Sequence, residues 1–235
     1  MADEEQGRLN TPEAEEEIPL FPLNVVLFPG MVQPLHIYEE RYKQMVHHCL
    51  ETTTPFGIVW ARPSVGEQVH GVSAIGTSAA IVHVEPLRDG RMNILAVGRS
   101  RFRLLAVFGD KPYLVGRVRA FPMSVRQALR AEALERRVRE HFGAYAATLH
   151  EATGLELEMA EWPEGTAAAA VLAAIALQVP LGDKQRLLAQ PTVDDILAAE
   201  IALFRREQVV LQHMAAMMSD AERLDEITTG AFSHN

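Results

Sequence analysis

The 235-residue chain is acidic overall, with 31 Asp and Glu against 22 Lys and Arg, and 48% of its residues are apolar. No run of about 18 uninterrupted apolar residues occurs, which argues against a transmembrane helix, and the acidic N-terminus is the reverse of the basic start of a signal peptide. The single cysteine, Cys49, excludes an internal disulfide and a cysteine-based zinc site. We therefore expect a cytoplasmic protein with no membrane partner.

Charge divides the chain into three segments. Residues 1–17 carry seven acids against Arg8, giving −6, whereas residues 18–122 carry eleven basic residues against seven acids, giving +4. Residues 123–235 carry ten basic residues against seventeen acids, giving −7. The first segment is charged, polar and without periodicity, and it is predicted to be a disordered acidic tail. A basic block inside an acidic protein is a feature that bears on its partners.

The stretch 18–42, "IPLFPLNVVLFPGMVQPLHIYEERY", is largely apolar but holds four prolines. Each proline removes a backbone donor and disfavours helix in the residue before it, so a continuous helix is excluded. "NVVLF" (24–28) and "PLHI" (34–37) are predicted to be short buried strands, with Pro29-Gly30 between them. A helix is then predicted to begin near Glu39, with a stripe at helical spacing formed by Tyr42, Met45, Val46, Cys49 and Leu50.

The remainder of residues 18–122 predicts strands. They are expected at residues 56–61, 74–87, 91–98, 99–108 and 113–121. Asp89-Gly90 predicts a hairpin between two of them, and Gly98 predicts a bulge or bend. Six or so strands with one early helix indicate a closed or nearly closed β domain.

Helical spacing replaces the strand pattern after Phe121-Pro122. Residues 124–127 match a capping box at the start of a helix, and the apolar run 166–179 predicts a fully buried helix. Asp183 is predicted to cap a short helix, and Pro191-Thr192 to open the last and longest one. Residues 123–225 are therefore predicted to form a bundle of about four helices, followed by a C-terminal tail at 226–235. The fold class is α+β.

Motifs of the common enzyme classes are missing from the sequence. The three lysines, Lys43, Lys111 and Lys184, do not follow a glycine-rich loop, so no nucleotide-binding P-loop is present. Neither a Gly-x-Ser-x-Gly elbow nor a His-Glu-x-x-His pair occurs, and His47 and His48 face different ways on the predicted helix. We predict a protein that is not an enzyme, with no catalytic residues, no bound metal and no cofactor.

The pattern "IPLFPLNVVLFPGMVQPLHIYEERYKQMVHHC" (18–49) resembles the start of the N-terminal, substrate-binding domain of Lon-type ATP-dependent proteases, and especially its free-standing bacterial relatives. The resemblance continues through "GRSRFR" (98–103) and, more weakly, "VPLGDKQRLLAQ" (179–190). It implies a PUA-like β barrel followed by an α-helical bundle. It also implies recognition of polypeptide substrates, without the ATPase and protease domains of Lon.

One group of residues is a candidate for polypeptide binding through an exposed apolar groove. Core packing is the alternative for each of them, because a β barrel must be filled. The group consists of Phe28, Pro29, Gly30, Met31 and Trp60.

Alternating arginines form a second candidate, a basic sheet face for phosphate or RNA. On an extended strand, Arg99, Arg101 and Arg103 point to one side, and Arg117 and Arg119 repeat the pattern nearby. The alternative is a solvated face paired with carboxylates. The acidic tail could also fold over this face and compete with an acidic ligand.

The methionines Met214, Met217 and Met218 are a third feature, suited either to an adaptable contact surface or to a core or dimer seam. Homo-oligomerisation therefore stays open. The sequence favours a polypeptide-binding module whose partners are unfolded substrates or another protein. An RNA- or small-ligand-binding domain that uses the arginine face is the alternative.

Overall fold

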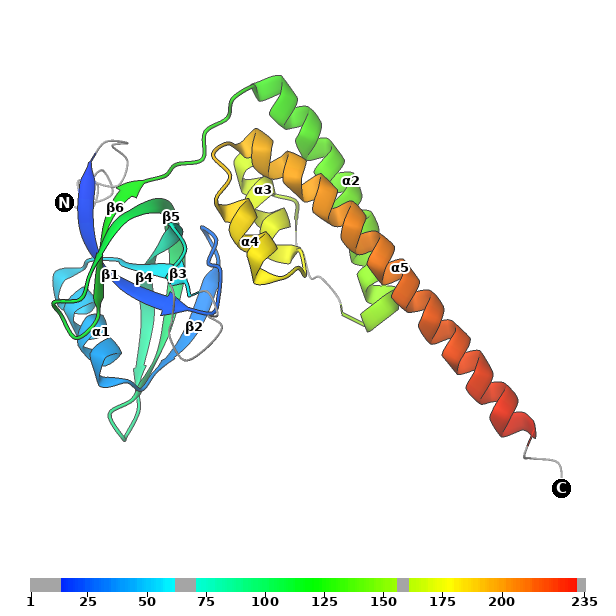
Figure 1. Cartoon of the computed structure of the whole chain (residues 1–235), viewed down its shortest axis with the longest axis horizontal. Helices are drawn as coiled ribbons and strands as arrows, with labels where there is room; N and C mark the ends of the chain where they lie inside the picture. The colour runs from blue at the N-terminus through cyan, green and yellow to red at the C-terminus, as the bar shows by residue number, and fades with distance from the viewer. Residues whose placement is uncertain (1–13, 62–70, 156–160, 232–235) are drawn as a thin grey trace. The chain divides into compact units, whose positions relative to one another are not determined.

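The structure, a computed structural model, describes residues 14–61, 71–155 and 161–231, with side chains of the last helix described as far as residue 217. The chain forms two compact units (Figure 1). The first contains residues 1–124 and 180–192, and the second contains residues 125–179 and 193–235. The chain therefore passes between the units three times, after residues 124, 179 and 192.

The first unit, called the strand unit below, holds six strands with ring-like pairing. Their order in the sheet is β2-β5-β4-β3-β1-β6, and β6 pairs again with β5, which closes a ring of five strands, while β2 pairs with β5. The strands are β1 (Glu15–Leu23), β2 (Val32–Ile37), β3 (Phe56–Trp60), β4 (Ile75–Pro86), β5 (Met92–Phe108) and β6 (Leu114–Ala120).

The length of β5 makes this closure possible. Its first half pairs with β2 on one side, and its second half pairs with β6, while β4 runs along its other edge. The sequence predicted two strands here, divided at Gly98, whereas the structure has one strand of 17 residues. The predicted irregularity is present, because the register against β4 shifts between Thr77 and Ala79, opposite Arg101 and Gly98.

The predicted strand at residues 24–28 is wrong. The first strand lies earlier, and it includes residues 15–17 of the predicted disordered tail; residues 1–13 lie outside the described part. Val26, Leu27 and Phe28 are buried without joining a ladder. The Thr77 hydroxyl instead donates to Leu27 O at 2.6 Å, and just after this stretch Gly98 N donates to Met31 O at 2.9 Å.

The predicted turn at Pro29-Gly30 and the strand at 34–37 are confirmed. Met31 N donates to Phe28 O at 3.1 Å, and Gly30 has φ +79°. A turn with proline second and a left-handed third residue is of type II, which needs glycine at that third position.

Helix α1 (Glu40–Thr52) follows β2 and buries the predicted stripe. Tyr42, Met45, Val46 and Cys49 are buried against the strands, whereas Leu50 is exposed. Each such side chain stabilises the unit by roughly 1.5–3 kcal/mol through removal of apolar surface from water. Burial raises the pKa of the Cys49 thiol to about 11, so this cysteine is an inert core residue.

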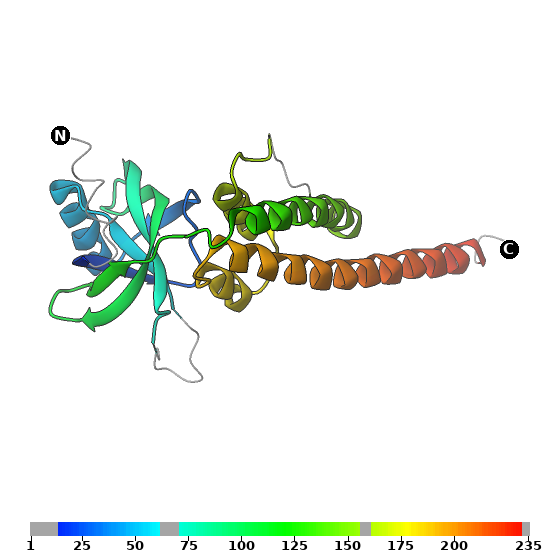
Figure 2. The ribbon, with the colours of Figure 1, turned by 90° about the horizontal axis from the view of Figure 1, so that it is seen from above.

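The second unit, called the helical unit below, contains α2 (Ala128–Thr153), α3 (Thr166–Ala176) and α5 (Val193–Ala231). Figures 1 and 2 show α2 and α5 side by side, with α5 continuing past the end of α2. Tyr145 of α2 and Phe204 of α5 meet at a ring separation of 5.3 Å, and the Tyr145 hydroxyl accepts a hydrogen bond from Gln178 N at 3.0 Å. Tyr145 and Phe204 thus lie in the core of this unit.

Several details of the helical half differ from prediction. Residues 124–127 do not form a capping box: α2 begins at Ala128 without a side-chain cap, and Ser124 instead forms a β-bridge with Thr192. Helix α3 buries mainly its alanines at 169, 170, 173 and 174 and is not buried all round. Met214 and Met217 are exposed, which excludes the core alternative for these two and leaves the contact surface and the dimer seam open. The last helix runs to Ala231, beyond the residue 225 at which the sequence placed its end.

Helix α4 (Leu181–Leu188) groups with the strands, although the sequence assigned it to the helical bundle. Pro180 precedes its first turn, so the predicted cap, Asp183, lies inside the helix as its third residue. Asp183 is buried there and forms an ion pair with Arg186.

Replacing Gly98 by alanine should lower the free energy of unfolding of the strand unit by about 2–3 kcal/mol, because a Cβ there would lie 2.3 Å from Phe28 O and force the backbone apart. Gly109→Ala is the matched control in the same unit, since its Cβ would meet nothing within 4 Å. Urea unfolding measures both. Equal stability of the two variants would show that the close approach at Gly98 is wrong.

Candidate functional site

Arg101 holds the α4 segment on the strand unit. Its Nη1 atom donates to Leu188 O and to Gln190 O, both at 2.7 Å, and its Nη2 atom donates to Pro122 O at 3.2 Å. The side chain is only 3% exposed and lies 4.6 Å from the centroid of the Phe121 ring. Leu188 ends α4, so the guanidinium satisfies carbonyl groups that a helix C-terminus leaves without partners.

A second anchor joins α4 to β4. The Gln185 side-chain amide donates to Ile75 O at 2.9 Å, and Gln185 is buried. The sequence alone does not predict either of these two contacts. Burial lowers the pKa of Arg101 to about 10, so the group stays charged at neutral pH.

The α4 segment lies over two of the predicted polypeptide-binding residues. Lys184 Nζ sits 6.0 Å from the centroid of the Phe28 ring, and a Cβ on Gly182 would lie 3.9 Å from Trp60. Phe28 is 3% exposed, and Trp60 is half-buried with its indole nitrogen donating to Asn24 Oδ1 at 3.3 Å. Phe28 therefore occupies a packed position in this structure.

The other three predicted residues lie at the surface of the turn before β2. Pro29 and Met31 are half-buried, and Gly30 is exposed. Met31 also packs against the main core of the strand unit. These residues form the turn that leads into β2.

The five arginines of the predicted basic face have different environments. Arg101 is buried and bonded to carbonyls, so it cannot contact a ligand without release of α4. Arg99 and Arg103 are exposed. Arg117 pairs with Glu17 at 3.3 Å and Arg119 with Glu15 at 2.6 Å. The alternative of a face paired with carboxylates therefore holds for Arg117 and Arg119.

An outward-facing groove of about 470 Å³ lies over β2, β4 and β5. Cross-strand register places Leu95 between Pro34 and His83, and Asn93 between His36 and Glu85. One row is thus largely apolar, and the neighbouring row is polar. The lining residues are Pro34, Leu35, His36, His83, Glu85, Asn93, Ile94 and Leu95.

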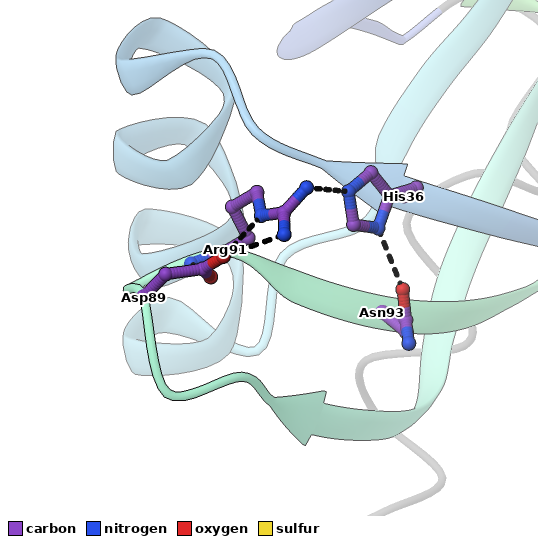
Figure 3. Close-up of polar contacts among 4 residues, drawn as sticks. All are labelled: His36, Asp89, Arg91 and Asn93. Atoms are coloured by element: carbon purple, nitrogen blue, oxygen red, sulfur yellow. Dashed lines mark hydrogen bonds and ion pairs between the residues drawn. The ribbon is translucent and has the colours of Figure 1, made fainter.

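Hydrogen bonds fix the polar row of this groove, as Figure 3 shows around His36. Arg91 Nη1 lies 3.4 Å from His36 Nε2, and His36 Nδ1 lies 2.8 Å from Asn93 Oδ1. Because a guanidinium only donates, His36 Nε2 accepts, and the ring proton is on Nδ1 and is donated to Asn93. The Asn93 amide in turn donates to Glu85 at 2.9 Å.

Asp89 positions Arg91 at the end of this chain of bonds. Arg91 Nε donates to Asp89 Oδ2 at 2.7 Å, and these hydrogen bonds lower the pKa of the Asp89 carboxyl to about 2. Asp89 belongs to the predicted hairpin turn. Because its pKa is this low, Asp89 is ionised and bonded to Arg91 throughout the physiological pH range. The groove therefore presents oriented amide, imidazole and carboxylate groups beside apolar side chains.

The free edge of β2 is protected against pairing with another strand. Among the described strands β2 pairs only with β5. Gly98 N donates to Met31 O. Because hydrogen-bonded and non-hydrogen-bonded pairs alternate along an antiparallel ladder, the backbone N and O of Pro34 point away from β5. Proline offers no N–H there, and the Gln33 side chain covers Pro34 O at 3.0 Å. A ligand in the groove would lie on the sheet face and not extend the sheet.

A second cavity of about 550 Å³ lies beside the end of α1 and the β5–β6 turn. Its lining carries charges of both signs and includes Glu17, His48, Asp110, Lys111 and Arg117. This mixture does not favour an anion or a cation.

Metal-ligand clusters and membrane-spanning helices are both absent from the described part of the chain. No group of three or more His, Cys, Asp or Glu side chains there could hold a metal ion. None of the helices there combines the length and apolar character needed to cross a bilayer.

The sequence did not predict that Arg101 anchors α4, or that His36, Asn93 and Glu85 form the polar row of the groove. The alternation of Arg99, Arg101 and Arg103 signalled a shared direction, but not that residues 188–190 would cover the middle one. The Asp-Gly hairpin was a weak signal for the polar row, because this hairpin sets Glu85 opposite Asn93.

The structure is thus of the α+β class, with a six-stranded sheet whose strands pair in a ring-like order, and with helices. The family model for the "ATP-dependent protease La (LON) substrate-binding domain" matches residues 17–206. This match covers most of the chain, which therefore belongs to the Lon substrate-binding domain family.

Individual relatives agree with this assignment. Lon protease of Porphyromonas gingivalis is 27% identical over 123 residues, which are 51% of this chain and 15% of that protein's length. The crystal structure of a Lon N-terminal domain protein from Xanthomonas campestris is 26% identical, with a TM-score of 0.56 over 80% of this chain and 98% of that one. The N-terminal domain of Mycobacterium avium complex Lon protease, at 16% identity, shares the fold with a TM-score of 0.57 over 81% of this chain and 98% of that one.

Arg101→Lys should release α4 from the strands, because a single ammonium cannot reach the three carbonyls that the guanidinium serves. We expect a loss of about 3 kcal/mol in unfolding free energy and faster hydrogen exchange of the α4 amides. Arg99→Lys, at an exposed position two residues away, is the control. If α4 exchange is the same in both variants, Arg101 does not hold the segment.

Proposed function

We propose that this chain is a non-enzymatic module that binds polypeptides, in particular unfolded segments of protein substrates, in the cytoplasm. The proposal takes from the family its printed role, substrate binding; the match to the Porphyromonas gingivalis Lon protease spans 15% of that protein's length. It includes the finer fold assignment, a PUA-like β barrel, as an inference from the ring-like strand pairing.

The observation that carries the proposal is the groove over β2, β4 and β5. It offers an apolar row at Pro34 and Leu95 beside a row of hydrogen-bonding groups at His36, Asn93 and Glu85. Unfolded polypeptides present both apolar side chains and unpaired backbone groups, so a surface with both kinds of contact suits them. Pro29, Gly30 and Met31 lie in the turn that leads into β2 and would extend this surface.

A fixed polar row reduces the entropic cost of binding. The bonds from Asp89 through Arg91, His36 and Asn93 hold each group in one orientation before a ligand arrives. Groups that are oriented in advance lose less freedom on association. A short groove of this kind favours weak binding of many sequences over tight binding of one.

Binding of RNA or a small anion at the arginine face is the alternative function. Arg99 and Arg103 are exposed and favour it. Against it, Arg101 is buried and two of the five arginines are paired with glutamates. Polypeptide binding agrees better with these environments.

Leu95→Gln should weaken binding of a reduced and alkylated model protein about tenfold, because it removes apolar contact worth about 1.4 kcal/mol at the centre of the groove. Leu105→Gln is the matched control, since Leu105 lies on the same strand outside the groove and is 40% exposed. Fluorescence anisotropy measures both. Binding that is unchanged in Leu95→Gln, or absent from the wild-type chain, would contradict the proposal.

A further inference from the structure

The start of β1, residues Glu15–Glu17, is attached to the strand unit on one side only. These residues, called the N-terminal arm below, pair with β6 in the register Glu15↔Arg119, Glu16↔Val118 and Glu17↔Arg117. Pairing of β1 with β3 begins only at Leu20. The arm therefore covers the edge of β6 as an added strand, with its own outer edge unpaired among the described strands.

Ion pairs hold the two ends of the arm. Glu15 Oε1 lies 2.6 Å from Arg119 Nη2, and Glu17 Oε1 lies 3.3 Å from Arg117 Nη2. All four side chains are between 41% and 55% exposed, and exposed pairs of this kind contribute little to stability. The arm is thus specific in its register but weakly attached.

The arginine side of this edge has more charge than the arm neutralises. Arg103 of β5 lies directly opposite Arg119 of β6, and two like charges in that relation repel. Arg103 has no carboxylate partner among the described residues, and its guanidinium lies 4.9 Å from the centroid of the Phe121 ring. Arg103 therefore adds positive charge at this edge that the arm does not neutralise.

The middle residue of the arm is a poor match for its position. Glu16 lies opposite Val118, which is completely buried, and the next residue of β1 on that face, Ile18, is 1% exposed. Glu16 is itself half-buried. A carboxylate loses hydration at such a position, whereas an apolar side chain would gain from it.

We propose that the edge of β6, with Arg103, Arg117 and Arg119, is a binding site for extended acidic–apolar–acidic segments of other polypeptides, and that the N-terminal arm occupies this site in the free chain. The inference rests on the proposed polypeptide-binding function and names a ligand class for it. Unlike the edge of β2, which Pro34 blocks, this edge already accepts a strand. A ligand segment displaces the arm and repeats its backbone pairing, the mode known as β-strand addition.

The tether favours the arm in this competition, because a covalently linked segment acts at high effective concentration. The charge of residues 1–17, seven acids against Arg8, adds to this by repelling acidic ligands at long range. Weakening the ion pairs of the arm should therefore increase ligand affinity rather than decrease it. This sign distinguishes a competing arm from an arm that merely forms part of the fold.

The test uses a fluorescent peptide with the sequence TPEAEVEIPL, which copies residues 11–20 with Glu16→Val. Its affinity is compared between the wild-type chain and the double variant Glu15→Gln/Glu17→Gln. We expect about tenfold tighter binding to the variant, since two exposed ion pairs no longer hold the arm. Adding Arg117→Gln/Arg119→Gln to that variant should abolish binding, whereas Arg130→Gln/Arg137→Gln, the same charge change on the helical unit, should leave it intact.

Two further measurements make the outcome decisive. Hydrogen exchange at Glu15–Glu17 should accelerate when the peptide is added to the wild-type chain, which reports displacement directly. A peptide with Gln at positions 15 and 17 should not bind. Equal affinity for wild type and Glu15→Gln/Glu17→Gln, or binding that survives loss of Arg117 and Arg119, overturns the inference. Displacement of the arm by a single-stranded RNA oligonucleotide but not by the peptide also overturns it.

A reduced and alkylated model protein, measured with the same variants, separates this inference from the proposed function. If the model protein binds and the acidic peptide does not, the site at β6 is wrong while polypeptide binding stands. If neither binds, the proposed function fails as well.

Discussion

The buried guanidinium of Arg101 is the interaction on which the strand unit depends. Burial of an unpaired charge costs several kcal/mol, so the group must have partners. It finds them in the carbonyls of Leu188, Gln190 and Pro122, and two of these lie at the end of α4, where a helix carries partial negative charge. One side chain therefore joins β5 to two segments that follow it in the chain by 21 and by 87–89 residues.

The position of α4 determines which side chains of the strand unit stay exposed. With α4 in place, Phe28 lies next to Lys184 and Trp60 lies next to Gly182. The apolar opening of the sequence therefore serves mainly as core. Two surfaces on the outside of the strands are the groove centred on Leu95 and the edge of β6. Both are built from paired strands whose register fixes their side chains, so their geometry is set before a ligand arrives. They differ in chemistry, since the groove is apolar and hydrogen-bonding and the edge is basic.

Local pattern was enough to predict most of the helices and strands, but not the position of the first strand or the contacts between distant segments. The spacing of Tyr42, Met45, Val46 and Cys49 predicted α1 because only a helix brings them to one face. The β-branched run 24–28 suggested a strand because burial and strand pairing give the same composition, and only the partners at Thr77 and Gly98 distinguish them. Arg101 and Arg103 share a strand face, yet one is covered and one is exposed. That difference depends on residues 188–190, which no local pattern connects to β5.

Native-state hydrogen exchange, followed residue by residue in increasing denaturant, tests most directly whether α4 belongs to the strand unit. If the account is right, the amides of α4 open with the same free energy and denaturant dependence as those of β4 and β5, and differently from those of α2 and α5. Opening of α4 together with α2 and α5, while β4 and β5 stay protected, would contradict it.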